Sequence, residues 1–197
     1  MTCLKGKISW DKICKEIQER SLNQTLLEVE SAEKLRKQIL KCLNDARNAE
    51  ILSTNLNEIY QLLKISNGKQ GYYEITGGGR DSKRNFKRDP DIPHFKLNNG
   101  RWFDFTITID ETNKSAQIIG FVFEIRFPKR EDETKFSYLR IDLNLPDHNN
   151  AARDLRFHLH PSNDDIMVHS PPMSPLEILH MFVYGMDIRD NDKPRSS

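Results

Sequence analysis

Residues 101–128 read RWFDFTITIDETNKSAQIIGFVFEIRFP, and this stretch decides the fold class. Its first part alternates apolar with polar side chains, in the order Phe103, Asp104, Phe105, Thr106, Ile107, Thr108 and Ile109. Alternation with a period of two is typical of a β-strand with one buried face. After a polar turn at 111–114, residues 118–127 are apolar at nearly every position, which favours a central strand. The two segments therefore predict neighbouring strands of a larger antiparallel sheet.

Further strand-like segments lie on both sides of this pair, at residues 72–76, 94–97, 136–145 and 155–159, with turn-forming residues between them. Near the end, Ser174 is followed by a proline and, three residues after the serine, by Glu177. This is the pattern of a capped helix, which we expect to reach about Tyr184 and to end at Gly185. We therefore predict an α+β fold with N-terminal amphipathic helices, an antiparallel β-meander of five or six strands, and a C-terminal helix packed on the sheet.

Residues 8–65 contain neither glycine nor proline and carry apolar side chains at helical spacing. Ser9 and Ser31 are candidate N-caps of two helices, and residues 51–63 form a third apolar series. The composition changes at Asn67-Gly68. We predict a helical segment at 1–67, an α+β domain at 68–186 and a loose polar tail at 187–197. The apolar stripes either cover the sheet of the same chain or form an arm that binds a partner, and the change of composition favours the arm.

The segment from Arg80 to Arg101 is rich in basic residues, since it contains seven lysines and arginines and only three aspartates. Two interpretations stay open: a solvated loop, or a patch that attracts phosphate. In the second, the phosphate-binding residues are Arg84, Lys87, Arg88 and, from a later strand, Arg156. The three glycines at 77–79 do not have the P-loop spacing and indicate a flexible loop.

Residues 157–171 read FHLHPSNDDIMVHSP and concentrate titratable side chains. The alternation of a strand places His158 and His160 together on one face, opposite Phe157 and Leu159. We expect this histidine face to be exposed to solvent. Basic and acidic groups that share one face of a strand can act together on a substrate or an ion.

Three interpretations of this stretch remain open. In the first, which leads among the functional ones, His158 and His160 form an acid–base pair that cleaves RNA without a cofactor, and Asp165 orients one imidazole. In the second, a divalent metal is bound by His158, His160, Asp164 and His169. In the third, the two aspartates cap a turn and the histidines are merely solvated.

The segment from about Phe136 to Gly185 resembles the C-terminal part of TumE-type toxins of bacterial toxin–antitoxin systems. The shared layout is a strand with an Asp/His loop from Asp142 to His148, a strand ending in His158-Leu159-His160-Pro161, and a helix from Ser174. Residues 162–165 and the long helical N-terminal part depart from that layout. The resemblance implies a bacterial cytoplasmic protein in a toxin–antitoxin or defence setting, with RNase activity.

The composition of the chain narrows the classes of protein to which it can belong. The chain is 37% hydrophobic and 30% charged, and it lacks an apolar run of the ~20 residues that a membrane span needs. It shows no apolar signal-peptide core, and its three cysteines form no CxxC pair, which favours free thiols in a reducing cytoplasm. We therefore expect a cytoplasmic toxin-like or defence-associated protein whose partners are RNA and either an antitoxin or a second copy of itself, with no membrane. The alternative is a non-enzymatic interaction protein that binds a partner through its N-terminal helices.

Overall fold

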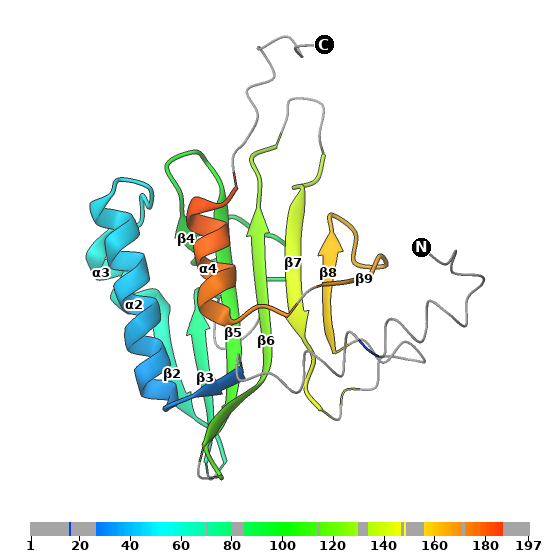
Figure 1. Ribbon diagram of the computed structural model, residues 1–197. Coiled ribbons are helices and arrows are strands. Elements are labelled where there is room, and N and C mark those ends of the chain that lie inside the picture. The colour runs from blue at the N-terminus through cyan, green and yellow to red at the C-terminus, as the bar shows by residue number, and fades with distance from the viewer. Residues whose placement is uncertain are drawn as a thin grey trace, which may run out of the picture.

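The computed structural model describes Glu16 and residues 27–69, 71–79, 85–113, 115–129, 134–146, 148, 156–170 and 172–186. Helices and strands are labelled as in Figure 1. They are β1 (Glu28–Val29), α2 (Ala32–Asn48), α3 (Leu56–Leu62), β2 (Leu63–Asn67), β3 (Tyr72–Gly77), β4 (Phe95–Lys96), β5 (Trp102–Asp110), β6 (Ala116–Arg126), β7 (Tyr138–Leu143), β8 (Phe157–Pro161), β9 (Val168–His169) and α4 (Pro175–Tyr184).

The strands form one antiparallel sheet in the order β2-β3-β5-β6-β7-β8-β9, and the short strands β1 and β4 pair with β6 and β5. Along this path each strand pairs with the next long strand of the chain, which is the arrangement of a meander. The predicted α+β class is confirmed. The sheet has nine strands and not the five or six expected, because β2 and β9 extend it at its two sides and the short strand β1 pairs with β6.

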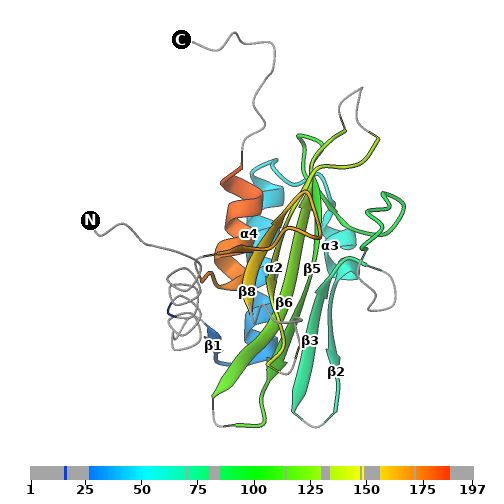
Figure 2. The same ribbon diagram turned by 90° about the vertical axis from the view of Figure 1, so that its right-hand side faces the viewer.

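One face of the sheet carries the hydrophobic core. Phe103 of β5 and Phe123 of β6 point to this face and are fully buried. Helices α2 and α4 lie across it, and Figure 2 shows both on the same side of the sheet. The ring of Phe182 in α4 lies with its centroid 6.1 Å from that of Phe103 and 6.2 Å from that of Phe123, in edge-on geometry. Burying such aromatic side chains contributes roughly 1.5–3 kcal/mol each and fixes α4 on the sheet.

The predicted caps set the starts of both long helices. Ser31 accepts a hydrogen bond from the backbone N–H of Lys34 and begins α2. Ser174 and Glu177 form a reciprocal capping box at the start of α4, and Gly185 ends it, as the sequence indicates. No helix within the described residues is long and apolar enough to cross a membrane.

The apolar stripe of α2 is covered by the sheet of its own chain. Leu35, Ile39 and Leu43 are at most 2% exposed and belong to one core with the sheet and α4. For residues 32–48 the structure therefore matches the core-covering alternative and not the partner-binding arm. The first predicted helix, from Ser9, lies outside the described residues.

The third expected helix is shorter than its apolar series suggests. Residues 51 and 52 precede α3, which ends at Leu62, and residues 63–67 form strand β2. Leu63 and Ile65 alternate with Lys64, and this period of two lets them pair with β3. The change of composition at Asn67-Gly68 thus marks a hairpin turn within the sheet, and residues 32–67 share the sheet and core of the rest.

The glycine run 77–79 has a packing role. A Cβ on Gly77 would overlap the ring of Phe105 on the neighbouring strand. Gly78 and Gly79 have φ angles of +86° and +82°, which glycine adopts without strain. The backbone N–H of Gly79 donates to the carbonyl of Pro93 at 2.7 Å. The run therefore turns the chain away from β3 toward the segment that covers the second face of the sheet.

Candidate functional site

The second face of the sheet, opposite the core, is polar and yet buried. Its buried charged and histidine side chains come from four adjacent strands and are Asp104, Glu124, Arg126, Arg140, Asp142, His158 and His160. In cross-strand register they form rows, since Asp104, Glu124, Arg140 and His160 are successive Cα partners from β5 to β8. The expectation that His158 and His160 face solvent is wrong, because these residues are only 2% and 3% exposed.

The segment from Asn85 to Pro93 covers this polar face. The carbonyl of Asn85 accepts a hydrogen bond from Arg126 at 3.2 Å. Arg88, with a φ angle of +53°, places its guanidinium 3.5 Å from the ring centroid of Tyr138. Arg88 also donates to both carboxylate oxygens of Glu124, at 3.0 and 3.2 Å. These contacts close one half of the face with ion pairs and leave the half near β8 to a different cluster.

That cluster consists of Asp142, His158 and His160. The register of β7 and β8 places Asp142 directly opposite His158, with His160 two residues further on the same face. The Nε2 atoms of both imidazoles lie 3.5 Å from Asp142 Oδ2, and the two rings are 4.9 Å apart in an edge-on arrangement. The strand pairing alone therefore brings two imidazoles and a carboxylate to one point.

Arg140 joins this cluster to the ion pairs beside it. Its Nε donates to Asp142 Oδ2 at 2.9 Å, and its Nη1 donates to Asp164 Oδ1 at 2.6 Å. Burial alone would raise the pKa of Asp142, but the interactions with His158 and His160 and the charge of Arg140 outweigh it and hold the pKa well below its usual range. Asp142 is therefore a carboxylate at neutral pH.

A pocket of about 320 Å³ opens above the cluster. Asp142, His158 and His160 line its polar part together with Arg140. Other lining residues come from β5, β6, the covering segment and the loops beside β7 and β8, and include Phe86, Thr108, Gly120, Asn144, Leu145, His148 and Met167. Gly120 keeps room in this wall, since a Cβ there would lie 2.8 Å from Leu145 Cδ2. The cluster is thus buried but borders a space that a small group can enter.

The acidic residues expected at the site lie elsewhere. Asp165 is exposed, and its backbone N–H donates to Asn163 Oδ1 at 2.8 Å in the turn after β8. No described contact joins Asp165 to an imidazole, and the carboxylate beside the histidines is Asp142. Asp164 is half exposed and forms ion pairs with Arg88 and Arg140. The assignment of Asp165 as the orienting residue is therefore wrong in geometry.

His169 of the alternative metal set lies on β9, where it is the Cα partner of His158. Its side chain is partly buried, and this burial, followed by the charge of His158, lowers its pKa. His169 is a neighbour of the cluster but does not converge with Asp142 and the two strand histidines. Of the alternative set, only His158 and His160 share one site.

The four predicted phosphate-binding residues are dispersed. Arg84 lies outside the described residues, and Lys87 is exposed on the covering segment. Arg88 is engaged with Glu124 and Asp164, so its charge is already balanced. Arg156 donates to the backbone carbonyls of Asn144 and Ile119, at 3.0 and 2.9 Å, and so links the residue after β7 to β6. The basic residue at the pocket is Arg140.

Sequence reasoning missed Asp142 and Arg140 as site residues. Both follow from one signal, because residues 138–143 alternate like the neighbouring strands and place positions 140 and 142 on the histidine face. The sequence of residues 138–143 shows this alternation, but only the pairing of β7 with β8 places Arg140 and Asp142 beside the two histidines.

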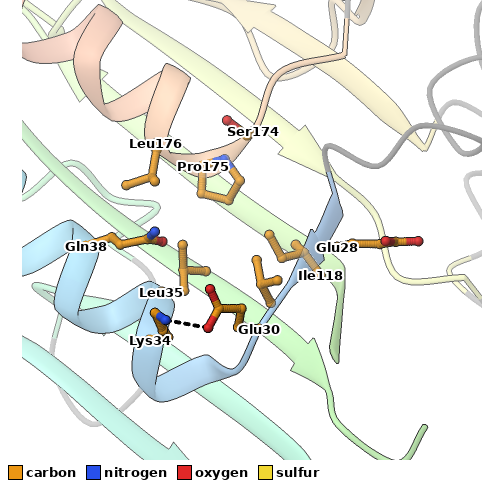
Figure 3. A pocket seen from close by; sticks show the side chains of 10 residues that line it. Glu28, Glu30, Lys34, Leu35, Gln38, Ile118, Ser174, Pro175 and Leu176 are labelled. Atoms are coloured by element: carbon orange, nitrogen blue, oxygen red, sulfur yellow. Dashed lines mark hydrogen bonds and ion pairs between the residues drawn. The ribbon is translucent and has the colours of Figure 1, made fainter. Parts of the chain in front are cut away.

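A second hollow of about 250 Å³ lies between β1, α2 and α4 (Figure 3). Its wall is apolar at Leu35, Ile118 and Leu176, and Lys34 forms an ion pair with Glu30 at its edge. It contains no histidine or cysteine, so its lining offers no group for acid–base or metal chemistry. The pocket above Asp142, by contrast, is lined by three histidines, one carboxylate and one guanidinium group.

Comparisons with protein-family models, with curated proteins and with solved structures found no match. The chemistry of the site therefore has to be argued from its own groups. Imidazole side chains can serve as general acids and bases, a guanidinium can pair with an anion, and the three-residue cluster has the composition of a metal-binding site.

Proposed function

We propose that this protein cleaves phosphodiester bonds of RNA in the pocket above Asp142, His158 and His160. The observation that carries the proposal is the convergence of two buried imidazoles and one carboxylate at the base of a pocket that Arg140 also lines. Buried groups of this kind cost folding free energy unless they are paired, and their concentration beside a cavity is typical of functional sites.

In the proposed reaction the cluster of Asp142, His158 and His160, called the centre below, accepts the proton of a ribose 2′-OH. The O2′ then forms a bond to the adjacent phosphorus, and the bond from phosphorus to the 5′-oxygen breaks. The leaving oxygen takes a proton from the centre, so that the products are a 2′,3′-cyclic phosphate and a 5′-hydroxyl end. Acid–base assistance of this kind contributes typically 10²–10⁴-fold to the rate.

Two lining residues suit an RNA substrate. Arg140 borders the pocket beside Asp142 and, in addition to its ion pairs with Asp142 and Asp164, can offer a further N–H donor to a phosphate oxygen. Phe86 is 53% exposed at the same pocket and offers a ring face on which an unpaired base can stack. Single-stranded RNA is therefore the proposed substrate, since its bases are free to leave the stack.

The proposed biological setting comes from the resemblance to TumE-type toxins. It is a bacterial toxin–antitoxin or defence system in the cytoplasm, with an antitoxin or a second copy of the chain as the protein partner. The interaction-only alternative loses part of its support, because the apolar stripe of α2 is already covered by the sheet.

The test is cleavage of a fluorescently labelled single-stranded RNA by the purified full-length protein. We expect RNA to be cut and the DNA of the same sequence to stay intact, because DNA lacks the attacking 2′-OH. The His158→Ala/His160→Ala variant should lose about 100-fold or more of the activity. His180→Ala is the matched control, since His180 lies on α4 and not in the pocket.

Three outcomes would contradict the proposal. They are equal cleavage of DNA and RNA, full activity of the double histidine variant, and failure of the folded protein to cut any of a panel of single-stranded RNAs. Thermal melts of each variant show whether lost activity reflects unfolding, since both histidines are buried. Phe86→Ala, at an exposed position, adds a variant that should raise KM with little effect on folding.

A further inference from the structure

We propose that Asp142, His158 and His160 bind one divalent transition-metal ion. The three side chains come from the adjacent strands β7 and β8 and point to one spot on the polar face. One ligand atom from each residue lies within 4.8 Å of the other two, and the side chains are 8%, 3% and 4% exposed. The role of this ion in RNA cleavage rests on the proposed function, whereas the binding of the ion does not.

The spacing of the cluster fits a metal better than it fits hydrogen bonds. Each Nε2 atom lies 3.5 Å from Asp142 Oδ2, which is longer than the ~2.7–3.2 Å of an ordinary N–H···O bond. Ligands at ~2.0–2.2 Å from a tetrahedral zinc ion stand about 3.4 Å from each other. The two His–Asp distances therefore match the spacing of neighbouring ligands around a tetrahedral ion, and the ligand atoms of all three residues lie within 4.8 Å of one another.

The nature of the donors selects the class of ion. Two imidazoles and one carboxylate suit zinc, iron(II), manganese(II) or cobalt(II), whereas magnesium and calcium prefer oxygen ligands alone. Three protein ligands leave at least one coordination position for water or substrate. Because Asp142, His158 and His160 line the pocket, we place this position on the pocket side, as in a catalytic site.

Two polar atoms of the cluster are buried and without a hydrogen-bond partner among the described residues. They are Asp142 Oδ1 and His160 Nδ1. Buried polar groups are nearly always bonded, and orphans such as these indicate a missing ion or water. An ion held by the two Nε2 atoms and Asp142 would supply a contact for Asp142 Oδ1, whereas His160 Nδ1, on the other side of its ring, would be satisfied by a water molecule.

The charge of the polar face also calls for a cation. Its four carboxylates, from Asp104, Glu124, Asp142 and Asp164, face three guanidinium groups, from Arg88, Arg126 and Arg140. Among the described residues these ion pairs therefore contain one carboxylate more than guanidinium groups. A divalent ion reverses the sign and makes the pocket attractive to an anionic substrate. Within the proposed function, Asp142, His158 and His160 would hold the ion, and the ion would supply a Lewis acid that makes a bound water more acidic.

The test is titration of the chelator-treated full-length protein with zinc chloride by calorimetry, and with cobalt(II) by visible absorption. We expect one ion per chain and cobalt bands of a site with nitrogen and oxygen ligands. Asp142→Asn and His158→Ala should each weaken binding by about 100-fold or more, comparable with the largest losses seen for residues that support metal ligands. His180→Ala, on the other side of the sheet, should bind like the parent.

Other outcomes separate this inference from the proposed function. If the folded parent binds neither metal in a one-to-one ratio, or if His169→Ala is as damaging as His158→Ala, the metal site is not the one proposed. If RNA is cleaved at full rate by protein shown to be metal-free, the inference fails and the proposed function stands. If one ion binds to Asp142, His158 and His160 but no RNA is cut, the metal site stands and the proposed function fails. The titration of the unmutated protein shows by itself whether one ion binds per chain, so this result does not depend on whether the variants fold.

Discussion

Arg126 is the largest of the completely buried side chains in the sheet, with 1% of its surface exposed. Its guanidinium lies 2.5 Å from Asp104, 2.8 Å from Glu124, and 4.4 Å from the ring centroid of Trp102. Burial raises the pKa of both carboxyl groups, while the charge of Arg126 acts in the opposite direction. Arg126 therefore keeps two buried acids close to a positive charge.

Replacing Arg126 by Met should lower the free energy of unfolding by about 3–5 kcal/mol, because two buried carboxylates lose a partner. Urea unfolding at neutral pH measures this. The double variant Arg126→Met/Glu124→Gln should recover part of the loss, since one orphaned charge is removed. Equal stability of the single variant and the parent would show that Arg126 does not offset these charges.

Cys42 is a buried free thiol on α2, with its Sγ 3.9 Å from His180 Nε2. Burial is the main cause that raises the pKa of the Cys42 thiol to about 11, and the negative charge of Asp45 is the second cause. An unfolded thiol titrates near pH ~8.5, so the neutral thiol stabilises the fold fully below that pH, and this stability is lost as pH rises through about 11. Cys3 and Cys14 lie outside the described residues.

The parent should therefore lose about 2–3 kcal/mol more than Cys42→Ala between pH 8 and pH 11. Chemical unfolding at several pH values, compared between parent and variant, isolates this thiol from tyrosines and lysines that also titrate. In a background lacking Cys3 and Cys14, Cys42 should also react slowly with a disulfide reagent at pH 8. Parallel pH profiles or rapid labelling would count against a buried neutral thiol.

At the scale of single elements, the two serine caps are matched features on helices that cover the same face of the sheet. Ser174→Ala removes the capping box of α4, and Ser31→Ala removes the cap of α2. Each should lower the free energy of unfolding by about 1 kcal/mol. Ser66→Ala, at an exposed position of β2, serves as control and should change little. Thermal melts compare the three, and caps that behave like Ser66 would refute their role.

Local patterns predicted most elements but not what covers them. The period of two in β5 and the caps at Ser31 and Ser174 are properties of neighbouring residues, and the structure confirms them. The face of His158 and His160 was predicted correctly, whereas its burial was not. Contacts of Asn85 with Arg126 and of Arg88 with Glu124, each between residues more than 35 positions apart, close the adjoining half of that face, and alternation within one strand cannot predict contacts with such distant residues.

The end of α3 shows the opposite difficulty. Leu62, Leu63 and Ile65 suit both a helix and a strand, and only the pairing of Leu63 with Gly77 and of Ile65 with Ile75 decides for β2. Asp142 was overlooked as a site residue for the same reason. Its role depends on the strand opposite, 16 positions away along the chain.

At the scale of the whole molecule, residues 32–67 form part of the one core. A fragment of residues 68–197 lacks α2 and β2, which exposes Ile75 and Ile107 on the core face of the sheet. It should show no cooperative melt and should bind a hydrophobic dye, because its apolar face has lost its cover. A monomeric fragment that melts cooperatively would contradict this and restore the separate helical unit.

A milder change in the full chain supports the same point. Leu43→Ala on the buried stripe of α2 should cost about 2–5 kcal/mol, whereas Lys41→Ala, two positions earlier and exposed, should be nearly neutral. Urea unfolding of the intact protein compares them. Similar values for both variants would mean that α2 is not part of the core.

The meander has a consequence for the moment at which the cluster of Asp142, His158 and His160 is completed during synthesis. Since each long strand pairs with the next one along the chain, the sheet can grow in the order in which the ribosome delivers its strands. Asp142 arrives with β7, but both imidazoles arrive with β8, after strands β2 to β7 have been made. A nascent chain therefore lacks the complete cluster of Asp142, His158 and His160 until its sheet is nearly finished, and so does any product of termination before β8.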